Sequence, residues 1–165
     1  MTDPECGLLI MTMDTVSSCV PRAEGEYNKF VELCPEFDTA KIFKADYDGT
    51  TDKGNTAAAA VLTAHPEIKK WLVTDANEEG CIGALRALES AGLDADACVV
   101  GLGAYMAKDE WKKEGPNAMK GEHLSYLEST NITLIDMGMK YEQRKGELTH
   151  LSQRWLAKRL EALNV

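Results

Sequence analysis

An arginine and an asparagine stand where they could bind a small molecule that carries hydroxyl or carboxylate groups. Arg22 closes the loop "TMDTVSSCVPR", just ahead of a helical pattern, and its planar guanidinium can donate to two adjacent oxygens at once. Asn77 follows an apolar run, and its amide offers both a donor and an acceptor to a ligand hydroxyl. Each residue also has a structural interpretation: a solvated arginine beside a helix, and an asparagine that caps the helical pattern after it.

Three more side chains stand at the ends of apolar runs or in the loops that follow them. Asp75 comes two residues before Asn77 and is either a second ligand group or the true helix cap. Asp14 lies in the same loop as Arg22. Tyr105 follows the fourth apolar run, where an aromatic ring could stack on a ligand ring. The candidate binding residues are therefore Arg22, Asn77, Asp75, Asp14 and Tyr105.

The aspartates allow a second kind of site. Asp14, Asp46 and Asp75 end successive apolar runs, an arrangement that would suit an acidic phosphotransfer site such as that of receiver domains. Such a site would also need a lysine at the end of a late strand, and Lys140 fits that position only loosely. A flavodoxin-like or receiver-like domain with an acidic site is thus an alternative interpretation.

Other sequence signatures of chemistry fail on their spacing. "GLG" at 101–103 does not continue as GxGxxG, because position 106 is Met, and no Walker or G-x-S-x-G pattern occurs. "DYDGTTDKG" is rich in oxygen ligands, but the position of the calcium-binding glutamate falls at Ala57, so we expect a turn there. The five cysteines contain no CxxC pair and the three histidines no metal-ligand spacing. We expect no catalytic residue, no metal and no cofactor.

The elements that must position the candidate residues follow a regular order. Apolar runs typical of buried strands alternate with helical patterns, which predicts right-handed βαβ units and a parallel sheet covered on both faces. We therefore expect one α/β domain over 1–165, a three-layer, doubly wound, mostly parallel sheet of about five or six strands. The predicted strands are 6–13, 40–47, 71–75, 97–103 and 131–138, with a possible edge strand at 123–128; the predicted helices are 22–33, 53–68, 78–93, 108–114 and 146–163.

All five candidate residues lie at the carboxyl ends of predicted strands or in the loops that follow them. Ligands of open α/β sheets bind in the crevice beyond those ends, near the point where the strand order reverses. The predicted fold thus brings the candidate residues to the edge of the sheet where a ligand is expected.

Composition excludes several partners. The formal net charge of −9 argues against nucleic-acid or anionic membrane surfaces, which are bound through clustered Lys and Arg. No apolar run approaches the roughly 20 residues that a membrane-spanning helix requires, so membrane insertion is not expected. The segment "MTDPECGLLIMTMDT" lacks the basic flank and long apolar core of a secretory signal peptide.

The order "TAHPEIKKWLVTDANEEGCIGALRALESAGLDADACVVGLG" resembles the second lobe of type I periplasmic sugar-binding proteins, above all the arabinose-binding kind. The features that carry the resemblance are "HPE", the strand and its Asn-containing loop, the helix of "GALRALESAG" type and the strand that ends in GxG. It is specific over roughly 40–103, and weaker but collinear over 8–40 and after 104.

The resemblance implies a sugar-binding lobe of an ABC-transporter solute-binding protein, which is not an enzyme. In that family Arg22 matches an arginine that grips sugar hydroxyls from the first loop, and Asn77 matches the asparagine after the third strand. The sequence departs from the family after GxG, where Ala104 and Tyr105 replace the usual Asn or Asp. A further ligand aspartate is replaced by Ala107 or its neighbours.

Partners and location also follow from the resemblance. The ligand would be a small sugar or polyol, and uptake would require an ABC permease that recognises the closed two-lobe receptor. This chain matches one lobe only, so we expect its cleft face to meet the missing lobe or a second copy in a homodimer. The family works outside the cytoplasm, in the periplasm or at the cell surface; without a signal peptide, a cytoplasmic protein or a recombinant fragment is the alternative. Related lobes form the effector-binding domains of sugar-responsive transcription regulators, a further alternative.

Overall fold

The computed structural model describes residues 3–101, 105–110 and 112, and the strands and helices named below all lie within this part of the chain. The predicted strand 131–138, the possible edge strand 123–128 and the predicted helix 146–163 lie outside the described residues. Strands and helices alternate along the chain as the sequence predicts. The strands are β1 (Cys6–Thr12), β2 (Ile42–Asp46), β3 (Lys70–Asp75) and β4 (Ala97–Val100); the helices are α1 (Val20–Leu33), α2 (Thr51–Ala64), α3 (Glu78–Ala91) and the short α4 (Ala107–Glu110).

The four strands form one parallel sheet in the order β2-β1-β3-β4. Leu8 of β1 lies opposite Ile42 on one side and Leu72 on the other. The chain winds outward from β1 to β2, then crosses β1 to form β3 and continues outward to β4. The winding direction therefore reverses between β1 and β3, which places the expected ligand crevice beyond the carboxyl ends of these two strands.

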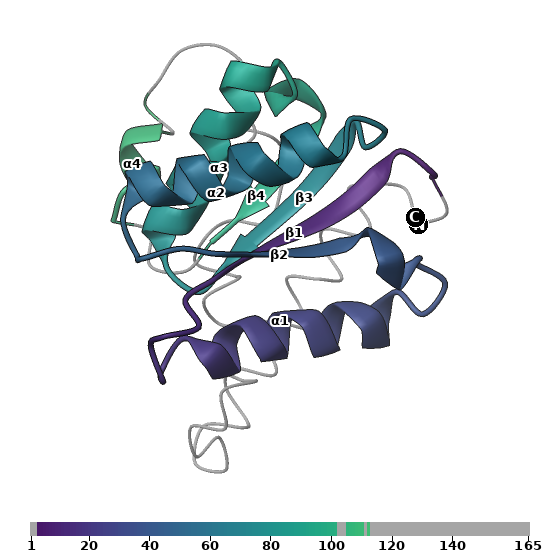
Figure 1. The fold of residues 1–165 in the computed structure, drawn as a ribbon, viewed down its shortest axis with the longest axis horizontal. Coiled ribbons are helices and arrows are strands. Elements are labelled where there is room, and N and C mark those ends of the chain that lie inside the picture. Colours follow the sequence, from purple (N-terminus) through teal and green to yellow (C-terminus); the bar gives the residue numbers. More distant parts are fainter. Residues whose placement is uncertain (1–2, 102–104, 111, 113–165) are drawn as a thin grey trace.

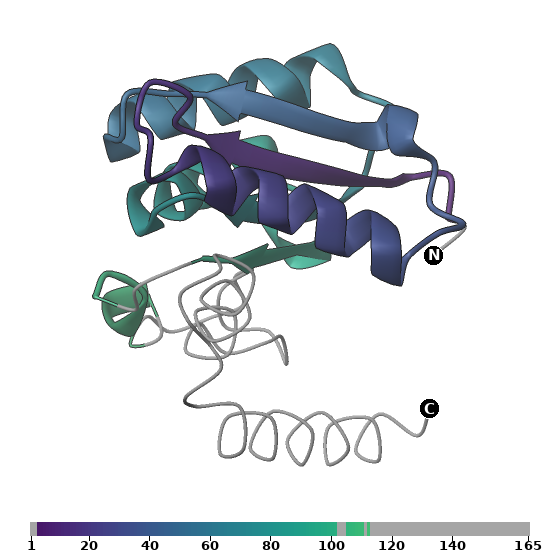
Figure 2. The same cartoon turned by 90° about the horizontal axis from the view of Figure 1, so that it is seen from below.

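Helices cover both faces of this sheet, as predicted. α2 and α3 lie side by side on one face, while α1 lies on the other (Figure 1). The view turned by 90° shows α1 running alongside β1, with β2 and β4 toward opposite edges of the sheet (Figure 2). The expected three-layer α/β fold is confirmed for the described strands and helices.

The main core lies between the sheet and the pair α2 and α3. Leu9, Met11 and Val73 point into it from the strands and are fully buried. Their neighbours Leu8 and Ile10 point to the other face and pack with Ala23 of α1. Burial on both faces explains why these strands are continuous apolar runs rather than alternating ones. Trp71 of β3 and the α3 residues Cys81, Ile82, Leu85 and Leu88 are also buried.

Glycines allow the backbones of α2 and α3 to touch. A Cβ built on Gly83 would lie 2.6 Å from both the amide nitrogen of Asn55 and the carbonyl oxygen of Thr51. A Cβ built on Gly54 of α2 would lie 3.3 Å from the Cα of Gly80, which is one turn before Gly83 on α3. The two helices therefore start close together, and this brings the loop before α3 next to the loop between β2 and α2.

The loop between β2 and α2 is the turn that the sequence predicts at "DYDGTTDKG". Gly49 has a φ of 90°, which favours glycine, and Thr50 caps α2 by accepting from the backbone nitrogen of Lys53.

Among the described residues, none of the helices combines the length and the hydropathy that a membrane span would need.

Candidate functional site

Asn77 caps α3, so its predicted structural role is confirmed. Its Oδ1 accepts from the backbone nitrogen of Gly80 at 3.3 Å and from the hydroxyl of Tyr47. Tyr47 can approach because position 80 is glycine: a Cβ there would collide with the Tyr47 ring. Within the described residues, the Asn77 Nδ2 has no hydrogen-bond partner, and the side chain is half-buried. Asn77 thus has its amide hydrogens left to donate, whereas its oxygen is already engaged.

Asp75 lies underneath this cap rather than on the surface. Its side chain is completely buried, and Oδ2 accepts from the backbone nitrogen of Cys81 in the first turn of α3. Its other oxygen, Oδ1, has no partner in the described part of the chain. Burial raises the pKa of Asp75 well above its usual range. The helix cap is Asn77 and not Asp75, and a ligand role for Asp75 stays a prediction.

Arg22 reaches the same place from the opposite face of the sheet. α1 begins at Val20, two residues before the predicted start, with Pro21 in its first turn, a position where proline costs no hydrogen bond. The Arg22 Nη1 donates to the carbonyl oxygen of Ala76 at 2.7 Å. The fold therefore brings Arg22 to the residue directly before Asn77, although the two candidates are distant in sequence.

A second contact ties α1 to the end of β3. The Thr74 hydroxyl donates to Glu26 Oε2 at 2.8 Å, one helical turn after Arg22. Burial and, second, the nearby charge of Asp75 raise the pKa of Glu26 well above its usual range. Neither Glu26 nor Thr74 was identified from the sequence, because β2 and α2 separate α1 from β3 along the chain.

Asp14 lies in the loop after β1, with its side chain exposed. Its backbone nitrogen donates to Asp46 Oδ1 at 2.8 Å, which joins the loops after β1 and β2. The acidic alternative gains no support from this arrangement. Asp75 is buried away from solvent, and the described part of the chain contains no group of three or more His, Cys, Asp or Glu placed to hold a metal ion. Lys140, which that alternative requires, lies outside the described residues.

Tyr105 stands at the same edge, held by a residue that its position in the sequence does not single out. Both oxygens of the fully buried Glu78 carboxylate accept backbone hydrogens: Oε2 from Tyr105 at 2.8 Å and Oε1 from Ala107 at 2.6 Å. The Tyr105 side chain remains 57% exposed. Partial burial and then a hydrogen bond with Glu79 raise the pKa of its hydroxyl. A glutamate at the start of a helix is typical for electrostatic reasons, so its type alone gave no signal.

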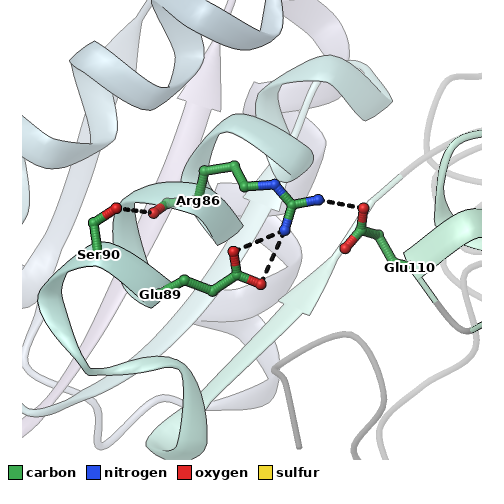
Figure 3. A network of polar contacts seen from close by, with 4 residues as sticks. All are labelled: Arg86, Glu89, Ser90 and Glu110. Carbon is green, nitrogen blue, oxygen red and sulfur yellow. Dashed lines mark hydrogen bonds and ion pairs between the residues drawn. The ribbon is translucent and has the colours of Figure 1, made fainter. Parts of the chain in front are cut away.

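The segment after Tyr105 is fastened to α3 a second time. Figure 3 shows Arg86 of α3 between two carboxylates. Its Nη1 donates to both oxygens of Glu89, at 2.9 and 2.8 Å, and its Nη2 donates to Glu110 of α4. Glu110 is almost fully buried, so this ion pair is largely shielded from solvent where it holds α4 against α3.

The fold thus gathers Arg22, Asn77 and Tyr105 around the start of α3, with Asp75 beneath them and Asp14 one loop away. The loop after β2 borders the same region, since a Cβ on Gly49 would lie 3.9 Å from Asn77 Nδ2. The arrangement offers amide and guanidinium donors and an exposed aromatic ring, which suit a ligand with hydroxyl oxygens and one apolar face.

Comparisons with known proteins give the class. No family model matches the chain. It is 37% identical over 120 residues to an ABC transporter L-arabinose-binding periplasmic protein of Azospirillum brasilense, across 71% of this chain and 35% of that protein. An ABC transporter periplasmic solute binding protein of Actinobacillus succinogenes, solved with bound D-allose, matches with a TM-score of 0.55 and 19% identity over 88% of this chain and 49% of that one.

A LacI family transcriptional regulator of an Arthrobacter species, solved with lactose, matches with a TM-score of 0.52 and 20% identity, over 65% of this chain and 38% of that one. The chain spans about a third of the length of the curated arabinose-binding relative. Over the part that it spans, the chain has the type I periplasmic sugar-binding fold, as its sequence resemblance implies.

Proposed function

We propose that this chain binds a small sugar or polyol as one lobe of an ABC-transporter solute-binding protein. The observation that carries the proposal is the contact of Arg22 with the Ala76 carbonyl, which brings Arg22 and Asn77 together beyond the carboxyl ends of β1 and β3. This is the switch point of the sheet, where α/β proteins bind their ligands. The arabinose-binding relative supports the sugar class.

Each of the three side chains would contact a different part of the ligand. Asn77 would donate from Nδ2 to a sugar hydroxyl, since its Oδ1 is held by Gly80 and Tyr47. Arg22 would donate from the part of its guanidinium that the Ala76 carbonyl does not use. The exposed Tyr105 ring would cover the C–H face of the sugar, in place of the polar residue usual in the family. Binding would break no covalent bond, so the protein would act as a receptor and not as an enzyme.

The partners and the place of action belong to the same proposal. A full receptor would present the bound sugar to an ABC permease from the periplasm or the cell surface. This chain would bury a sugar only when a second lobe, or a second copy of the chain, covers the edge that carries Asn77 and Tyr105. The effector-domain alternative predicts the same sugar contacts, but the 37% identical relative is a transport protein.

Isothermal titration calorimetry with L-arabinose, D-ribose and D-allose tests the proposal. Asn77→Asp keeps the oxygen that Gly80 and Tyr47 use and removes the amide donor; Arg22→Lys keeps the charge and removes the planar fork. Each should weaken binding by roughly 3- to 10-fold, because a net hydrogen bond contributes about 0.5–1.5 kcal/mol. The matched controls are Asn28→Ala on the exposed side of α1 and Lys69→Ala at the opposite edge of the sheet, and neither should change the affinity.

Heat release with any of these sugars that depends on Asn77 and Arg22 supports a working half-site. If the wild-type chain releases no heat with any of them, the isolated lobe is not a sugar receptor. If Asn28→Ala weakens binding as much as Asn77→Asp does, the ligand lies elsewhere on the molecule.

A further inference from the structure

Glu78 is a buried carboxylate whose two oxygens accept hydrogen bonds from a distant part of the chain. It is the first residue of α3, and none of its side chain is exposed. Each of its two oxygens accepts one backbone hydrogen from the segment after β4, from Tyr105 at 2.8 Å and from Ala107 at 2.6 Å. Hydrogen bonds to a charged acceptor are stronger than neutral ones, and a pair of them fixes the direction of the segment as well as its distance.

The two side-chain acceptors that cap the start of α3 are Asn77 and Asp75, not Glu78. Gly80 donates to the side chain of Asn77, and Cys81 donates to the buried carboxylate of Asp75. Neither of these two bonds at the start of the helix, where four backbone donors lack an intrahelical acceptor, involves the Glu78 side chain. The side chain of Glu78 is therefore free to turn toward the segment after β4, and it uses both of its oxygens there.

The same segment carries the candidate that departs most from the family pattern. Tyr105 is exposed, and its backbone is bound by the residue that directly follows Asn77. Arg86 and Glu110 hold the far end of the segment against α3. The loop after β3 and the segment after β4 are thus joined through α3, with Glu78 as the link nearest to both candidate side chains.

We propose that Glu78 is a positioning residue for ligand binding: it fixes Tyr105 beside Asn77, so that the loop after β3 and the segment after β4 receive a sugar as one unit. This inference rests on the proposed function, because it assigns a role at the same site. Glu78 contacts no ligand itself, and it acts through the backbone of Tyr105 and Ala107.

Glu78→Gln is the sharpest substitution, since it keeps the shape of the side chain but leaves one acceptor oxygen for two donors. Amide hydrogen exchange, followed by NMR, should become about tenfold faster at Tyr105 and Ala107, while Gly80 and Cys81 should keep their protection. Glu78→Asp retains both oxygens on a shorter stem and should give a smaller increase. Glu24→Gln, on the exposed side of α1, is the matched control and should change nothing.

The ligand arm uses calorimetric titration with L-arabinose, D-ribose and D-allose. Glu78→Gln should weaken binding of whichever of them the wild type binds by about tenfold. In a Tyr105→Ala background the same substitution should have no further effect, because its action passes through Tyr105. A general loss of structure would weaken binding in both backgrounds.

Unchanged exchange at Tyr105 and Ala107 in Glu78→Gln would overturn the inference. Faster exchange with an unchanged affinity would also overturn it, because the segment would then be anchored without any consequence for binding. A wild-type chain that binds none of the three sugars would refute the proposed function and, with it, the positioning role. In that case faster exchange would identify Glu78 as a structural anchor only.

Discussion

Adding one methyl group at Gly83 should destabilise the protein, although glycine is a poor helix former. A Cβ at this position would lie 2.6 Å from two backbone atoms of α2 and 2.8 Å from the carbonyl carbon of Gly54. Backbone atoms cannot rotate away as a side chain can, so the helices must separate. Overpacking of this kind costs about 3 kcal/mol, whereas alanine in place of glycine gains about 1 kcal/mol in helix propensity.

The expected net loss for Gly83→Ala is therefore about 2 kcal/mol of the free energy of unfolding, or roughly 4–8 °C in Tm for a chain of this size. Urea unfolding followed by circular dichroism measures it. Gly54→Ala is the graded comparison, because its nearest contacts, at 3.3 and 3.4 Å, are tight without being prohibitive, and its effect should stay within about 1 kcal/mol. A Gly83→Ala protein as stable as the wild type, or more so, would refute the backbone contact between α2 and α3.

Two further substitutions test buried carboxyl groups, and a third is a control at a partly exposed one. Asp75 and Glu26 have pKa values raised by burial above their ordinary 3.8 and 4.5, so each favours the folded state most below those ordinary values, and the contribution is lost as the pH rises through the raised ones. The urea midpoint should thus increase from pH 8 toward pH 5, and Asp75→Asn should flatten this dependence; an equal slope in the variant would contradict the assignment. At the contact of α4 with the second half of α3, Glu110→Gln should lower the free energy of unfolding in urea by about 1–2 kcal/mol, because the buried Glu110 carboxylate forms an ion pair with Arg86. Glu89→Gln should cost less than about 0.5 kcal/mol, as expected for a partly exposed i,i+3 pair, and equal costs would mean that the buried contact is no stronger.

The sequence was sufficient for the described part of the fold because burial on both faces leaves a strong local pattern. Each predicted strand that the structure describes is present within a few residues, and α3 begins at the predicted position after its cap. α1 starts two residues earlier than predicted, because proline is accepted in the first turn of a helix and Pro21 therefore does not end the helix there. The parallel sheet and its helices on both faces follow from the alternation of elements alone.

The candidate site was predictable only in part, since sequence position shows which loops meet but not where the side chains turn. Arg22 and Asn77 do come together, as the strand-end rule requires. The rule treats Asp75 and Asn77 alike, yet the Asp75 side chain is fully buried under the start of α3, whereas the Asn77 side chain is only half-buried. Glu78 escaped notice because its partners, Tyr105 and Ala107, belong to a segment that follows a different strand.

The last residues of β3 are fastened in alternation to opposite layers, Thr74 to Glu26 of α1 and Asp75 to the first turn of α3. The next carbonyl, that of Ala76, is held by Arg22. Consecutive residues secured from both sides leave the backbone before Asn77 with little rotational freedom. A ligand that meets Asn77 would then lose its own translational and rotational entropy, but would not have to order the loop that receives it, and more of the contact energy would remain as affinity.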